Sequence, residues 1–67
     1  MVSHDKYYIY ASYDGAWYRL DEGIGAVNMD LVGRYRSAYP EAVVSVTNRL
    51  MVDCGRREDD LERRFTG

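Results

Sequence analysis

The sequence predicts an α+β fold in which a β-hairpin is followed by a helix and a third, long strand (β-β-α-β). Three stretches point to it: two aromatic runs that flank Asp14-Gly15, a helical apolar stripe over residues 28–39, and strict apolar alternation over residues 42–54. The strands would form a small antiparallel or mixed sheet with one main helix on one face. The 67 residues, 1–67, make a single small domain.

The strongest local signal is the hairpin over residues 7–20. Asp14-Gly15 is typical of a type I′ turn, because Gly adopts φ > 0 freely and Asp tolerates it. With the turn there, pairing runs from Tyr13 opposite Ala16 to Ile9 opposite Leu20. Alternation then places on a core face Tyr7, Ile9, Ala11, Tyr13, Ala16, Tyr18 and Leu20, and on the opposite face Tyr8, Tyr10, Ser12, Trp17 and Arg19. A slip of one residue would exchange the two sets.

The helix is predicted to follow a loop over residues 21–25, with Asn28 as its N-cap. Val27 and Val32 stand at the positions of a hydrophobic staple, and Pro40 ends the helix at Tyr39. The stripe that would pack on the core face comprises Leu31, Val32, Tyr35, Ala38 and Tyr39.

Residues 42–54 allow two interpretations: one long, bulged strand, or a second hairpin that turns at Thr47-Asn48. Because β-branched Thr resists φ > 0, we favour the continuous strand. The first strand of the hairpin would then lie in the centre of the sheet, in the order 2-1-3.

Both ends of the chain are polar. Residues 1–6 are predicted to fray. Residues 56–67 are a charged segment that forms either a disordered tail or a short amphipathic helix with Leu61 and Phe65 on its apolar edge. The helix would carry two i,i+4 ion pairs, Asp59/Arg63 and Asp60/Arg64.

Composition argues against several classes of protein. A net charge of −2 lacks the basic footprint of a general nucleic-acid binder. One Cys and one His are too few for a structural zinc site, and we expect no metal and no cofactor. No signal peptide or membrane span is evident, so we expect a cytoplasmic protein without membrane contact. So short a chain has a marginal core, which dimerisation or a bound partner would supplement.

No constellation of residues supports catalysis, and we predict a non-enzyme. Two arginines near Cys54 would favour its thiolate, but the only histidine, His4, lies in the polar N-terminal segment. The stretch Gly23-Ile24-Gly25 fails the dinucleotide-binding fingerprint at its sixth position, Asn28.

The aromatic face opposite the core is the main functional candidate. Tyr, Trp and Arg dominate the centres of protein interfaces. We therefore predict a non-enzymatic protein-binding module, an inhibitor or accessory subunit of a phage or mobile element, that uses this face or an open strand edge. The predicted contact residues are Tyr8, Tyr10, Trp17, Arg19, Arg34 and Arg36. Two alternatives remain open: the face stacks on single-stranded nucleic acid, or the terminal helix covers it as a second core layer.

Overall fold

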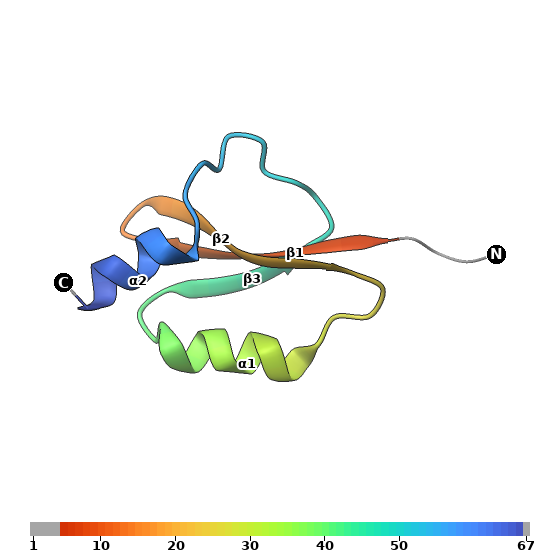
Figure 1. Ribbon diagram of the computed structural model, residues 1–67, viewed down its shortest axis with the longest axis horizontal. Coiled ribbons are helices and arrows are strands. Elements are labelled where there is room, and N and C mark those ends of the chain that lie inside the picture. Colours follow the sequence, from red (N-terminus) through yellow and green to blue (C-terminus); the bar gives the residue numbers. More distant parts are fainter. Residues whose placement is uncertain (1–4, 67) are drawn as a thin grey trace.

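A three-stranded antiparallel sheet and two helices make up the computed structural model of the protein, which describes residues 5–66 (Figure 1). The elements are β1 (Lys6–Tyr13), β2 (Ala16–Ile24), α1 (Met29–Ala38), β3 (Val43–Thr47) and α2 (Glu58–Thr66). The strand order is β2-β1-β3, so the predicted α+β fold and strand order are confirmed. Of the segment predicted to fray, residues 1–4 lie outside the described residues, while Lys6 already begins β1.

The hairpin turns at Asp14-Gly15 as predicted, with φ of 52° and 76° at the two residues. Pairing follows the prediction from Tyr13 opposite Ala16 to Tyr10 opposite Arg19. There Leu20 forms a β-bulge, so that Ile9 faces Asp21 and not Leu20, and β2 continues to Ile24. The predicted pairing of Ile9 with Leu20 and the predicted loop over residues 21–25 are therefore wrong.

The bulge changes which side chains beyond it face the helices. It turns Asp21 and Gly23 to the side of Ile9 and Tyr7, their partners on β1. The Tyr7 ring lies so closely over Gly23 that a Cβ atom there would collide with the ring and its hydroxyl. Close packing of an aromatic ring, and not phosphate binding, therefore accounts for this glycine.

The core lies between α1, α2 and one side of the sheet, which we call the helix face. All seven side chains predicted for the core face belong to the core cluster or pack against it. Ile9 and Ala11 of β1 are fully buried, as is Val32 of α1. Burial of these side chains is the main favourable term in so small a fold.

Helix α1 begins and ends as predicted. The Asn28 side chain accepts hydrogen bonds from the amides of Asp30 and Leu31 at 3.0 and 3.3 Å, which satisfies two of the first unpaired amides. The C-cap is Tyr39, directly before Pro40. Of the predicted stripe, only Ala38 is exposed.

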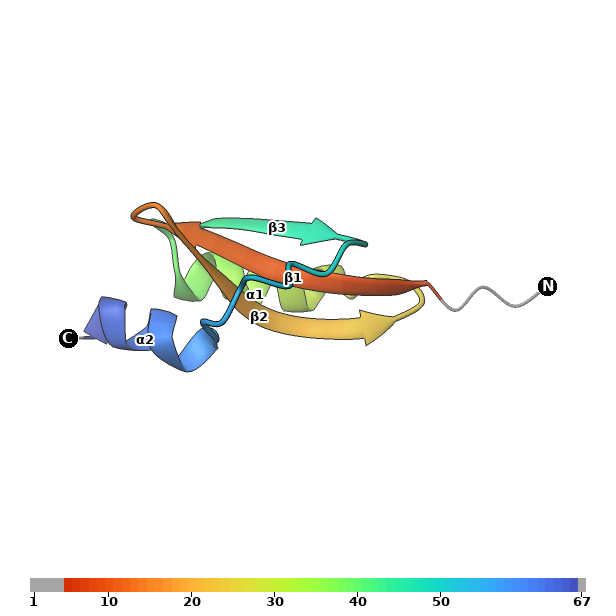
Figure 2. The ribbon, with the colours of Figure 1, turned by 90° about the horizontal axis from the view of Figure 1, so that it is seen from above.

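The third strand is shorter than predicted, because β3 ends at Thr47 and residues 48–56 leave the sheet. This stretch, which we call the crossing segment, passes over β1 on the side opposite the helix face and leads to α2 (Figure 2). The predicted continuous strand over residues 42–54 is therefore wrong, and so is the alternative of a second hairpin.

The charged C-terminal segment forms helix α2, and its apolar edge completes the core. Leu61 is fully buried, and the Phe65 ring packs on Tyr13 and Tyr39 with centroids 4.9 and 5.3 Å apart. Of the possibilities weighed for this segment, the amphipathic helix is confirmed. It covers the helix face near the hairpin turn and not the aromatic face.

The ion pairs of α2 differ from the predicted i,i+4 pairs. Arg63 binds Asp60 at 3.2 Å, one turn away, and Arg64 reaches across to Asp14 in the hairpin turn at 2.6 Å. Both pairs are exposed, so each contributes little on its own. The second pair nevertheless ties the end of α2 to the turn.

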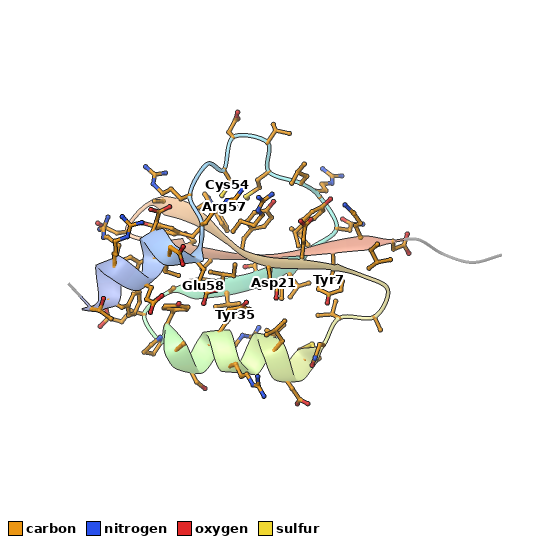
Figure 3. The ribbon with its side chains drawn as sticks, viewed as in Figure 1. Tyr7, Asp21, Tyr35, Cys54, Arg57 and Glu58 are labelled. Atoms are coloured by element: carbon orange, nitrogen blue, oxygen red, sulfur yellow. The ribbon has the colours of Figure 1, made fainter. Side chains whose placement is uncertain are left out.

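The bulge also creates a polar contact between α1 and β2 (Figure 3). The Tyr35 hydroxyl lies 3.3 Å from an Asp21 carboxylate oxygen and 3.4 Å from the Leu20 carbonyl, and it donates to this pair of acceptors. Burial, followed by the negative charge of Asp21, raises the pKa of Tyr35 from 10.0 to about 12.

This contact predicts a loss of stability in alkali. Between pH 10 and 12 the Tyr35 phenol stays protonated in the folded chain but loses its proton in the unfolded chain, so unfolding becomes more favourable as pH rises. The free energy of unfolding can fall by at most about 1.4 kcal/mol per pH unit in this range, and partial exposure of the Tyr35 side chain makes the fall smaller. Urea unfolding of wild type and Tyr35→Phe between pH 9 and 11.5 measures the effect. Equal pH dependence in the two proteins would contradict it.

Candidate partner-binding surface

The aromatic face of the hairpin is largely covered by the crossing segment. Tyr10 is only 1% exposed and Tyr8 only 8% exposed. Their rings stack with centroids 6.3 Å apart. The prediction that these two tyrosines lie on an uncovered face is therefore wrong. Neither helix buries them, since residues 48–56 cross this side of the sheet.

Three hydrogen bonds hold the crossing segment to the hairpin. The Met51 amide donates to the Tyr10 hydroxyl at 2.8 Å. The Cys54 thiol lies 3.4 Å from the Trp17 carbonyl oxygen, and the Arg19 amide donates to the Arg56 carbonyl at 3.0 Å. The last two bonds engage the outer edge of β2, so the segment closes that part of the sheet edge.

A cleft of about 450 Å³ remains between the crossing segment and the tip of the hairpin. Its walls are Gly15, Ala16 and Trp17 on one side and Leu50, Met51, Val52, Asp53, Cys54 and Arg56 on the other. Its volume lies in the range of ligand-binding clefts, about 300–1,000 Å³.

The cleft brings together three of the large apolar side chains that the described residues leave exposed. Trp17 is 40% exposed, Leu50 48% and Val52 84%. Of the predicted contact residues only Trp17 lies here. Leu50, Val52 and Cys54 were not predicted as contact residues because residues 42–54 were predicted to form a strand. The one available signal was Asn48, which interrupts the apolar alternation of residues 42–54.

The predicted arginines do not join Trp17 in one surface. Arg19 lines, with Arg57 and Glu58, a separate, mixed-charge hollow of about 290 Å³. Arg34 and Arg36 are exposed on α1, which lies on the other side of the sheet from the crossing segment. The structure therefore divides the predicted contact residues among a buried pair, a cleft and two further places.

The reactive groups of the described residues are dispersed. The Cys54 thiol is partly buried against the Trp17 and Arg56 carbonyls (Figure 3), while His4 lies outside the described residues. Within residues 5–66, no three Cys, His, Asp or Glu side chains gather as metal ligands would.

Comparison with models of protein families, with curated proteins and with solved structures finds no match for this chain. In the part of the chain that the structure describes, neither helix has the length and apolar character needed to cross a membrane.

Proposed function

We propose that the protein is a non-enzymatic protein-binding module that takes a large apolar side chain of its partner into the cleft between Trp17 and the crossing segment. It would act as an inhibitor or accessory subunit by occupying the partner's surface. A free thiol in a chain without disulfides fits a reducing, cytoplasmic setting.

The observation that supports this proposal is the grouping of exposed Trp17, Leu50 and Val52 around one cleft. Exposing apolar side chains costs solvation free energy, and contiguous exposed patches mark interaction sites. Tryptophan is among the residues that contribute most to binding at interface centres. Asp53 and Arg56 at the rim supply one acid and one base that would orient the partner's backbone.

The test is a selection of random peptides on the immobilised protein, followed by affinity measurement. We expect selected peptides to share a large apolar residue and to bind Trp17→Ala about 10- to 100-fold more weakly, the range for loss of an interface hot spot. Ile24→Ala is the matched control, since Ile24 is 63% exposed on β2 away from the cleft. Peptides that bind Trp17→Ala as tightly as wild type would refute the cleft as the site.

Salt separates this proposal from the nucleic-acid alternative. An apolar peptide complex should change affinity by less than about threefold between 50 and 500 mM salt, whereas phosphate contacts lose orders of magnitude over such a range. A single-stranded oligonucleotide bound by wild type, steeply salt-dependent and lost in Trp17→Ala, would replace the protein-binding role.

A further inference from the structure

The two outer edges of the sheet, along β2 and β3, differ in how many of their backbone groups are already hydrogen-bonded. Along β2, the Trp17 carbonyl and the Arg19 amide bond to the crossing segment, and the outward Glu22 amide donates to the Asp21 side chain at 2.8 Å. Engaged amides and acidic side chains block the addition of another strand. The β2 edge is therefore obstructed from Trp17 to Glu22.

The β3 edge is open. Arg19 and Tyr10 are opposite each other in the β1–β2 pair, and the Arg19 amide points away from β1, so these two residues are a pair without hydrogen bonds between them. Tyr10 therefore directs its amide and carbonyl toward Ser45 of β3. Backbone direction alternates along an antiparallel pair, so Val44 and Val46 direct theirs away from the sheet. Within residues 5–66 no other segment bonds to these two amides, and no element lies beyond β3 (Figure 2).

The side chains of β3 leave this edge uncharged and partly apolar. The strand reads Val-Val-Ser-Val-Thr, with Val43 65% exposed and Val46 36% exposed. Unguarded edges of this kind pair with a further strand. The nearest charged residues are Glu41 before the strand and Arg49 after it, both exposed and without an ion pair in the described chain.

These charges fit a second copy of the same chain. If two β3 strands pair antiparallel about a two-fold axis at Ser45, Val44 of each copy faces Val46 of the other. Both outward-facing positions then pair, giving about four backbone hydrogen bonds. Glu41 and Arg49 flank β3 four residues before and four residues after Ser45, so in this register Glu41 of each copy lies at the same end of the paired strands as Arg49 of the other, and opposite charges come together at both ends. Shifting the axis to Val44 or Val46 loses both charge pairs.

We propose that the protein forms a two-fold symmetric dimer through β3, which joins two sheets into one of six strands. We expect the assembly to stop at the dimer, because the strand edges that the described residues leave are the two β2 edges, which the crossing segment and Asp21 obstruct from Trp17 to Glu22. The cleft at Trp17 stays free, so dimerisation and partner binding are separate properties.

Sedimentation from about 10 µM to about 1 mM is the first measurement, since pairing through one strand edge is a small and therefore weak interface. We expect a monomer–dimer equilibrium that Val46→Lys abolishes, because it places two like charges near the axis. Ile24→Lys, a charge of the same kind on β2, should leave the equilibrium unchanged, and circular dichroism verifies that both variants are folded. A wild-type monomer throughout, or growth beyond the dimer, would overturn the proposal.

A charge exchange tests the register. Glu41→Arg and Arg49→Glu should each weaken self-association about 10-fold, because like charges then meet at both ends. Mixing the two variants restores opposite charges at both ends and should restore dimers as heterodimers, as should the double variant by itself. Single variants that dimerise like wild type, or a mixture that does not recover, would overturn the register about Ser45. An extended peptide could also be added as a competitor. If it displaces the dimer and binds Glu41→Arg and Arg49→Glu as tightly as wild type, the β3 edge would be assigned to a foreign strand instead.

Discussion

Replacing Leu61 with alanine should lower the free energy of unfolding by about 2–5 kcal/mol, the range for removing a fully buried leucine. Leu61 is the only fully buried side chain of α2 and belongs to the same cluster as Ile9 and Val32. Because a domain of this size has a small core, this loss removes much of its stability. Urea unfolding followed by circular dichroism measures it.

Leu50→Ala is the control for this prediction, since it makes the same chemical change at a side chain that is 48% exposed. It should lower stability by less than about 1 kcal/mol. A Leu61→Ala protein as stable as Leu50→Ala would mean that α2 is not part of the cooperative core. Comparing unfolding by helical signal with unfolding by tyrosine absorbance distinguishes loss of the whole fold from detachment of α2 alone.

Replacing Tyr10 with alanine should cost about 3–5 kcal/mol, because it leaves a ring-sized cavity beneath the crossing segment. Tyr10 packs between the sheet and that segment, and its hydroxyl accepts the Met51 amide. The change should therefore both destabilise the fold and release residues 48–56 from the sheet. Urea unfolding gives the first effect.

Tyr10→Phe isolates the hydroxyl. It should lower stability by about 0.5–1.5 kcal/mol, the usual contribution of one hydrogen bond, and speed hydrogen exchange at the Met51 amide. The control is Tyr8→Phe, because within residues 5–66 the Tyr8 hydroxyl makes no side-chain hydrogen bond. Unchanged exchange at Met51 in Tyr10→Phe would show that the hydroxyl does not hold the segment.

The hairpin turn between β1 and β2 was predictable because the residues that specify it lie within the turn itself. Asp14 and Gly15 both take φ > 0, which Gly adopts freely and Asp tolerates, and pairing near a two-residue turn follows from the turn itself. The Asn28 cap was predictable for the same reason. The bulge at Leu20 was not, because no residue type near it marks a bulge, and the Asp21–Tyr35 contact that accompanies it joins β2 to a helix distant in sequence.

The candidate site was largely hidden from sequence reasoning. Apolar and polar residues alternate over residues 42–54 as they would in a strand, yet β3 ends at Thr47. Beyond it the Met51 amide bonds to Tyr10, and Leu50 and Val52 line the cleft. Alternation records which residues are apolar but not which surface they meet. Trp17 was identified correctly as exposed, but the stacked tyrosines beside it were not identified as buried.

The position of Trp17 has a practical consequence, since it is the only tryptophan in the chain. Trp17 lines the cleft and is 40% exposed, so its fluorescence responds to whatever displaces water from the indole ring. A compound seated there would shift the emission to shorter wavelength, while association at the distant β3 edge would leave the spectrum unaltered. Tryptophan fluorescence can therefore be used, without a label, to titrate the protein with candidate ligands of the cleft.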